Sequence, residues 1–323
     1  MKLLIGAFAG ALLAASSALT PAVAQEFTKP LRIVVAAPPG GTSDILARLI
    51  APELSEAVGQ PVVVENKAGA GSNIGADYVA KAEPDAHTLL LMDVSTLATA
   101  PWLYSDLSYD PTNDLAPVTM ISFSPYIFAV NPQLEIDNVE ALVALGEEDP
   151  RALRIGNSGI GSATHLAGVM LGDHLGLDWT TIPYRGGSES SRAVVSGEAT
   201  VIINGSTATL PFVKSGQLTG IALTGDSRLD DLPDMPTFGE LGLAADQMGS
   251  WQGLLTTGGS SEELVERLGE EVRRIVESPE MQARVAEQGA RTATGTSQEF
   301  STWLADSTET YGEIIQQFGI TIQ

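Results

Sequence analysis

The stretch LRIVVAAPPGGTSDILARLI, residues 31–50, decides the fold. Its first half is aliphatic and β-branched, which is typical of a buried strand, and from Ile45 the apolar residues recur at helical spacing. The Pro-Pro-Gly-Gly run at 38–41 ends the strand and lets the backbone approach a ligand, while Thr42 or Ser43 is placed to cap the helix. The stretch therefore predicts a helix N-terminus with free N–H groups at the carboxyl end of a strand, where a carboxylate or phosphate binds. A plain βα turn without a ligand is the alternative.

A second stretch, LRIGNSGIGSATHLAGVML at 153–171, repeats this design. It joins a short apolar run to a glycine-rich turn with the hydroxyls of Ser162 and Thr164, and His165 lies three residues into the expected helix. If the two junctions face each other, two helix N-termini converge on one cleft and bind an anion with neutral backbone dipoles. His165 either contacts the ligand or is a neutral capping residue in the loop.

Two further strand ends carry polar residues. Ser95 and Thr96 follow the apolar run at 88–92, and the segment Tyr184–Gly187 follows the run at 180–184. We expect both to reach the same cleft, because the carboxyl ends of parallel strands meet at one edge of a sheet. Arg185 either pairs with a distal carboxylate of the ligand or holds an acidic loop nearby.

The rest of the chain follows a β-α-β-α pattern, which implies mostly parallel sheets covered by helices on both faces. Strands are expected at 31–37, 61–65, 88–92, 125–130, 153–156, 180–184, 199–203 and 219–224. From Ser260 onward the pattern is helical almost to the end. We expect two α/β lobes: 25–128 with 229–323 form lobe I, and 129–228 form lobe II. Two chain crossings between the lobes would make a hinge.

Composition limits the partners. Of 323 residues, 44% are hydrophobic and 18% are charged, which is typical of a folded globular chain. The formal net charge is −23, so nucleic acids and anionic membrane surfaces are not expected partners. There is no cysteine, and the three histidines show no metal-ligand spacing, so no metal or cofactor is expected.

The N-terminus predicts export. Lys2 is followed by an apolar run and then by Ala22-Val23-Ala24, an A-x-A cleavage pattern. We expect a signal peptide at 1–24, cleaved after Ala24, with an uncleaved anchor as the alternative.

Catalytic motifs are weak or missing. The glycines at 69, 71 and 75 are spaced G-x-G-x-x-x-G, which is not the dinucleotide fingerprint, and neither a P-loop nor a G-x-S-x-G elbow is present. The chain is therefore not expected to be an enzyme. The enzymatic alternative is an exported α/β protein that acts on a carboxylate, with His165 as general base.

Taken together, these motifs resemble the substrate-binding proteins of tripartite tricarboxylate transporters, the Bug-type periplasmic receptors. The resemblance covers nearly all of the mature chain and is carried by the long run from Lys29 to Leu91 and by SGIGSATHLAG, IPYRGGSES and DDLPDMPTFGELGL. It implies a two-lobed α/β fold of the periplasmic-binding-protein kind, hinged, with the ligand cleft between the lobes. It also implies a periplasmic, non-enzymatic receptor that captures a small organic carboxylate and delivers it to a membrane permease; a sensor for a signalling partner is the alternative. We expect the ligand to be a di- or tricarboxylate or an aromatic acid, and the receptor to be a monomer.

The resemblance, added to the strand-end argument, gives a set of expected ligand-binding residues. These are Gly40, Gly41, Thr42, Asp44, Ser95, Thr96, Gly161, Ser162, Thr164, His165, Tyr184, Arg185, Gly186, Gly187 and Asn204. The chain departs from the family pattern at Ala86-His87, where Gly-Tyr is usual, and at Asn204, where an aspartate is common. The second departure removes a charge that would repel an anion.

Overall fold

The structure, a computed structural model, describes residues 27–243 and 248–322. The expected leader at 1–24 lies outside these residues. In the described part of the chain, no helix is both long and apolar enough to cross a membrane.

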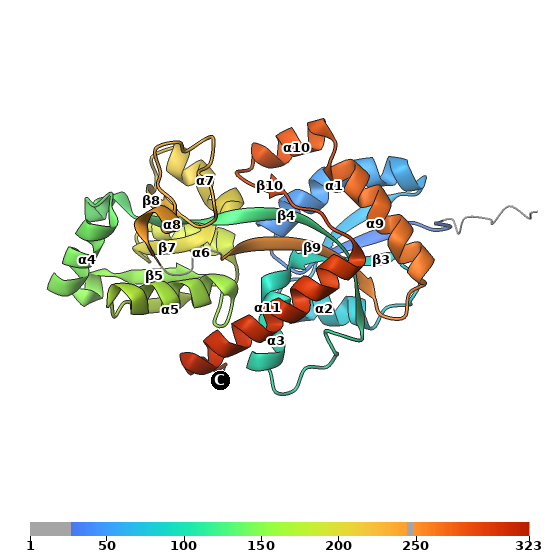
Figure 1. The fold of residues 1–323 in the computed structure, drawn as a ribbon, viewed down its shortest axis with the longest axis horizontal. Coiled ribbons are helices and arrows are strands. Elements are labelled where there is room, and N and C mark those ends of the chain that lie inside the picture. Colours follow the sequence, from blue (N-terminus) through green and yellow to red (C-terminus); the bar gives the residue numbers. More distant parts are fainter. Residues whose placement is uncertain (1–26, 244–247, 323) are drawn as a thin grey trace, which may run out of the picture.

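The first lobe is built on three parallel strands (Figure 1). Their order in the sheet is β2 (Val62–Asn66), β1 (Leu31–Val35), β3 (Thr88–Asp93). The helices that follow them are α1 (Thr42–Val58), α2 (Asn73–Ala80) and α3 (Val94–Leu103). In the register of the sheet, Val35 pairs with Asn66 and with Leu91, so the three strands end side by side.

The second lobe repeats the arrangement with the order β7 (Val201–Gly205), β5 (Arg154–Asn157), β6 (Thr180–Pro183), again parallel. Its helices are α4 (Val139–Glu148), α5 (Ala163–Leu175), α6 (Gly187–Ser196), α7 (Ser206–Lys214) and the short α8 (Phe238–Leu241). Two 3₁₀ turns, Pro132–Leu134 and Pro150–Ala152, flank α4.

Two antiparallel strands join the lobes. β4 (Leu115–Val130) pairs with β9 (Gly249–Thr257) as far as Pro125, and from Tyr126 it pairs with β7 and with β8 (Thr219–Leu223). β9 also pairs with β3. Figure 1 shows β4 and β9 running side by side between the lobes, and we propose that these strands are the two chain crossings.

The C-terminal segment returns to the first lobe. It comprises α9 (Glu262–Val276), α10 (Pro279–Ala286), β10 (Arg291–Thr292) beside β4, and α11 (Ser297–Gln317). Phe300 of α11 is buried in the first lobe, whereas Tyr311 and Ile315 belong to the core of the second. The long helix α11 therefore links the two lobes by side-chain packing in addition to the two strands.

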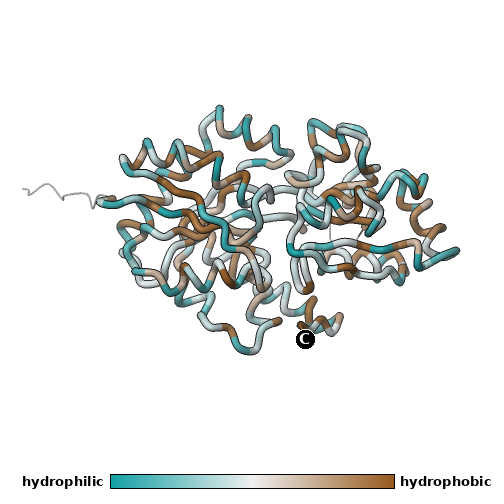
Figure 2. The backbone as a smooth tube through the Cα atoms, turned by 180° about the vertical axis from the view of Figure 1, so that it is seen from behind, coloured by the Kyte–Doolittle hydropathy of each residue, from teal (hydrophilic) through white to brown (hydrophobic). Residues whose placement is uncertain are grey.

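Each lobe has apolar cores on both faces of its sheet. In the first lobe, α1, α9 and α10 cover one face and α2, α3 and α11 the other. In the second lobe, α4 and α5 cover one face and α6 and α7 the other. Figure 2 shows hydrophobic segments gathered inside both lobes, with hydrophilic ones on the outer helices. The two-lobed α/β fold expected from the sequence is confirmed.

The structure refines the predicted elements. All eight expected strands are present, but β4 begins ten residues before the expected run at 125–130. The crossing strands pair antiparallel, so among the named strands of the described residues parallel pairing is limited to the three-strand set of each lobe. Leu229, Leu232 and Met235 pack on the second lobe. We therefore propose that the chain returns to lobe I at β9, later than position 229.

Candidate functional site

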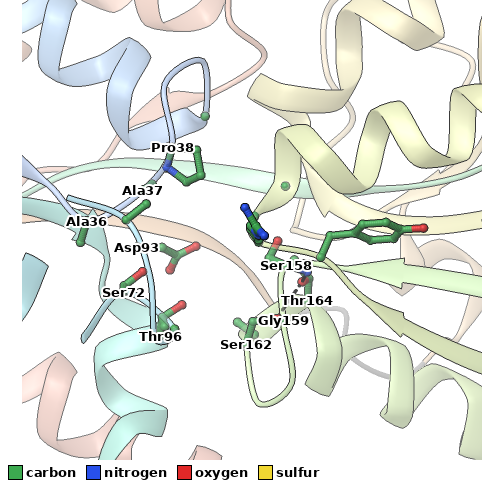
Figure 3. Close-up of a pocket in the computed structure, with 18 of the residues that line it drawn as sticks. Ala36, Ala37, Pro38, Ser72, Asp93, Thr96, Ser158, Gly159, Ser162 and Thr164 are labelled. Carbon is green, nitrogen blue, oxygen red and sulfur yellow. Dashed lines mark hydrogen bonds between the residues drawn. The ribbon is translucent and has the colours of Figure 1, made fainter. Parts of the chain in front are cut away.

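A cleft of about 1090 Å³ lies between the lobes, lined by residues at the carboxyl ends of all six parallel strands. The first lobe contributes the segments that follow β1, β2 and β3, and the second lobe those that follow β5, β6 and β7. Figure 3 shows side chains of the two lobes facing each other, with Pro38, Asp93 and Thr96 on one side and Ser158 and Ser162 on the other. Ligands of open α/β sheets bind at such strand ends, so this cleft is the candidate site.

The helix α1 points an uncapped N-terminus at the cleft. Its N-cap is Gly41, with extended backbone and no side-chain cap, so the expectation that Thr42 or Ser43 caps the helix was wrong by one residue. Gly41, Thr42 and Ser43 line the cleft. Because no side chain takes up the first N–H groups of the helix, they are available to an anion.

Asp44 supports this loop and does not line the cleft. Its carboxylate accepts hydrogen bonds from the Gly40 N–H (2.9 Å), Arg48 Nε (3.0 Å) and Asn66 Nδ2 (2.9 Å). Burial alone would raise the pKa of Asp44, but these partners outweigh it and lower the pKa. Asp44 is therefore an ionised group that fixes the 37–41 turn.

Two helices of the second lobe also begin at the cleft without a side-chain cap. The N-cap of α6 is Gly186 and that of α7 is Gly205, and both line the cleft. With α1, they bring three positive helix ends from both lobes to one space. An acidic protein can therefore hold an anion there with backbone N–H groups, in addition to the Arg185 and Arg192 side chains that line the cleft.

The loop before α5 is held by its own hydroxyls. Ser162 Oγ accepts the His165 N–H (3.3 Å) and lies 3.0 Å from Thr164 Oγ1, which accepts the Ser158 N–H (2.9 Å). Ser162 and Thr164 line the cleft and His165 does not. The His165 Nδ1 accepts the Gly161 N–H (3.1 Å), and burial lowers the pKa of His165. Of the two interpretations of this histidine, the geometry favours the neutral, loop-holding one.

The loop after β6 is fixed by Asn204 and Glu189. Asn204 Nδ2 donates to the Gly187 carbonyl oxygen and to Ser191 Oγ, both at 3.1 Å. Glu189 accepts the Arg185 N–H (2.9 Å), and the Arg185 side chain is exposed at the cleft. The Tyr184 ring packs against Gly156 inside the second lobe.

The lobes touch beside the cleft. Ser188 Oγ of the second lobe donates to the Gly40 carbonyl oxygen of the first at 2.8 Å. Pro38 lies against Gly186, and Leu103 against Gly161. The cleft is therefore bounded by contacts that must separate if the lobes open.

Polar residues outside the expected set also line the cleft. They are Ser43, Asn66, Ser72, Asp93, Thr99, Tyr104, Tyr126, Ser158, Ser188, Glu189, Arg192, Ser250 and Gln252. Asp93 directly follows the apolar run of β3, and Ser250 and Gln252 alternate along β9, so strand-end and period-two signals were present in the sequence.

The structure thus brings most of the expected site residues together. Eleven expected residues line the cleft: Gly41, Thr42, Thr96, Gly161, Ser162, Thr164, Tyr184, Arg185, Gly186, Gly187 and Asn204. Four do not line it: Gly40, Asp44, Ser95 and His165. Among the residues that the structure describes, no group of three His, Asp or Glu side chains is arranged to hold a metal ion.

Comparison with known proteins assigns the family. A family model described as the tripartite tricarboxylate transporter family receptor matches residues 46–320. The chain belongs to this family. Family membership confirms the resemblance drawn from the sequence motifs and makes the chain one of a group of receptors.

Solved structures of similar proteins agree with the fold. The periplasmic binding protein BugD is 28% identical and superposes with a TM-score of 0.85, over 91% of this chain and 99% of BugD. Rpa4515 of R. palustris, solved with adipate, is 30% identical with a TM-score of 0.86, over 91% and 99% of the two chains. MatC (Rpa3494) of Rhodopseudomonas palustris, solved with malate, is 26% identical with a TM-score of 0.81, over 90% and 100%.

Proposed function

We propose that this protein is a periplasmic receptor that captures a small organic carboxylate between its lobes and delivers it to a tripartite-type membrane permease. The observation that carries the proposal is the set of uncapped N-termini of α1, α6 and α7, which open into one cleft from both lobes. Backbone N–H groups at helix N-termini bind carboxylates without a counter-charge. Adipate and malate in the similar Rpa4515 and MatC support this ligand class.

Periplasmic location and permease delivery rest on the family. The family description names a transporter receptor, and the similar BugD is a periplasmic binding protein. One chain supplies every loop of the cleft, so we propose that a monomer suffices. Pull-down of detergent-solubilised membranes with ligand-loaded and ligand-free protein tests delivery: the loaded receptor should retain permease subunits.

The α1 N-terminus offers a direct test of the binding mode. A Cβ added at Gly41 meets only the Pro38 carbonyl oxygen at 3.5 Å and Ser188 Oγ at 3.8 Å, so Gly41→Ala fits the fold but places a methyl group in the cleft. We expect Gly41→Ala to weaken carboxylate binding by about tenfold, or roughly 1.4 kcal/mol, in calorimetric titrations.

Gly239→Ala is the matched control. Gly239 lies in α8, away from the cleft lining, and an added Cβ meets only Thr237 Oγ1 at 3.8 Å. The control should bind as the unaltered protein does. Equal affinity of both variants would remove the α1 N-terminus from the site, and no binding of any carboxylate to the ligand-stripped protein would overturn the proposed function.

A further inference from the structure

The first-lobe side of the cleft is lined by one carboxyl group, that of Asp93, and the proposed ligand is an anion. Figure 3 shows the Asp93 side chain directed into the cleft from the end of β3. None of the ion pairs among the described residues involves Asp93. Because no cationic partner offsets its charge, the ionised carboxyl group repels some anions more than others and so affects which anions the site accepts.

Asp93 is held as a hydrogen-bond acceptor. A chain of donors runs toward it from the first turn of α1: Ser43 Oγ donates to Gln252 Oε1 (2.6 Å) and Gln252 Nε2 to Ser250 Oγ (2.7 Å). Ser250 Oγ then donates to Asp93 Oδ2 (2.8 Å), and the Ser95 N–H donates to Oδ1 (3.0 Å). The Ser95 hydroxyl and the Trp251 N–H lie near the same carboxylate, so the donors around Asp93 are neutral groups.

The Tyr126 hydroxyl lies close by and lacks a partner. Tyr126 lines the cleft with only 1% of its surface exposed, and its hydroxyl has no hydrogen-bond partner among the described residues. Burial, and then the charge of Asp93, raises the pKa of Tyr126, so the phenol stays protonated. A buried hydroxyl without a partner is costly, and a ligand atom that accepts from it would remove that cost.

Together these groups complement a hydroxyl on the ligand. A ligand hydroxyl donates to Asp93 and accepts from Tyr126, whereas an ionised carboxylate would face Asp93 as a like charge. On the basis of the proposed function, we infer that Asp93 and Tyr126 form a specificity subsite that selects organic acids with a second, hydrogen-bond-donating group over fully ionised dicarboxylates of the same length.

The charge state of Asp93 changes with pH, so the pH dependence of ligand selectivity is an independent test of this subsite. Desolvation deep between the lobes raises its pKa to about 6. The titratable groups that face it are two phenols, Tyr126 from β4 and Tyr311 from α11, and burial raises the pKa of Tyr311 to about 12. Strand β9 contributes neutral Ser250 and Gln252, and the charged residues that line the same cleft from the second lobe are Arg185, Glu189 and Arg192. Above about pH 6 Asp93 is therefore the group that gains charge, and discrimination against dianions grows.

The test uses matched ligands and an isosteric variant. The probes are 4-hydroxybutanoate with succinate and 6-hydroxyhexanoate with adipate, titrated by calorimetry at about pH 8, where both carboxylates of each diacid are ionised. Asp93→Asn keeps an oxygen that can cap α3 and removes the charge, because Asn and Asp are equally good N-caps. Asp306→Asn, at an exposed position of α11 that does not line the cleft, is the control for net charge.

We expect the unaltered protein and Asp306→Asn to bind at least one hydroxy acid about tenfold or more tightly than its diacid. In Asp93→Asn this preference should fall by at least about tenfold, mainly through tighter diacid binding. Equal binding of hydroxy acid and diacid, or a preference that Asp93→Asn leaves unchanged, would overturn the inference while the proposed function stands. If no acid of either kind binds, the proposed function fails and the inference fails with it.

A second measurement needs no variant. 3-Sulfopropanoate carries a sulfonate that stays ionised over the whole range used, so any change in its affinity relative to 4-hydroxybutanoate reports on the protein. This relative affinity should fall as the pH rises from about 5 to about 8, as Asp93 ionises. A ratio that is constant over this range would overturn the inference even if Asp93→Asn failed to fold.

Discussion

At the scale of single residues, the hydrogen bonds of each polar side chain decide whether it holds its own loop or faces the ligand. Asp44 was expected at the ligand, yet its carboxylate is fully engaged by the Gly40 N–H, Arg48 and Asn66. A side chain near a helix N-terminus can hydrogen-bond within its own loop or to the ligand, and the sequence does not show which of the two it does. Asp93 was passed over, although its position at the end of a strand was visible.

We propose that Ser162 both holds its loop and donates to the ligand, and a matched variant separates the two roles. Its Oγ accepts the His165 N–H and can accept from Thr164, which leaves its own proton to donate into the cleft. Ser162→Ala should therefore cost about 1 kcal/mol of the free energy of unfolding through the lost cap and weaken carboxylate binding by about 1 kcal/mol.

Ser278→Ala controls for the cap. Ser278 caps α10 with the same bond, from the Met281 N–H at 3.2 Å, and does not line the cleft. Chemical unfolding and calorimetry should show a similar loss of stability in both variants and a loss of affinity in Ser162→Ala alone. If both variants bind carboxylate equally well, Ser162 does not donate to the ligand.

At the scale of elements, the sequence predicts the strands that are uniformly apolar. It misses the strands in which apolar and polar residues are mixed. The first part of β4, residues 115–124, contains Pro117, Thr119, Ser122 and Ser124 among its apolar residues, and three of these polar side chains are fully buried. β4 pairs with β9 on one side and with β10 on the other, so this part of the strand lies inside the sheet and its polar side chains are buried. Such long-range pairing leaves no signal in a local pattern, so the sequence predicts only the apolar run at 125–130 as a strand.

The turn into α6 depends on how closely Gly187 packs against the Asn204 side chain of β7. A Cβ at Gly187 would lie 2.5 Å from Asn204 Oδ1, so the glycine and the asparagine side chain share one space. Gly187→Ala should displace Asn204 and the α6 N-terminus, destabilise the fold by roughly 1–3 kcal/mol and weaken carboxylate binding as well.

The same Gly239→Ala variant serves as control, because a Cβ there meets no atom closer than 3.8 Å. Thermal unfolding and calorimetry of the two variants test the fit. A Gly187→Ala protein that is as stable and binds as tightly as the control would show that this turn tolerates a side chain.

At the scale of the whole molecule, the two-lobed plan followed from the β-α pattern and from the break near 129, because parallel units with short connections leave few arrangements. The return crossing was harder to place. The segment from 229 to 243 is rich in proline and acidic residues and reads as a linker, yet its apolar residues pack on the second lobe. The link through α11 joins residues far apart in the chain, which no local pattern reveals.

The central claim is that the lobes close around a carboxylate, and a distance between them tests it directly. The chain has no cysteine, so cysteines introduced at exposed Glu56 in α1 and Glu147 in α4 can be labelled uniquely, one in each lobe. The distance between spin labels at these sites is then measured in ligand-stripped protein with and without each carboxylate of a panel. We predict that the carboxylate that binds shortens this distance, because the ligand stabilises the closed state through contacts to both lobes. An unchanged distance with a carboxylate that calorimetry shows to be bound would contradict the account.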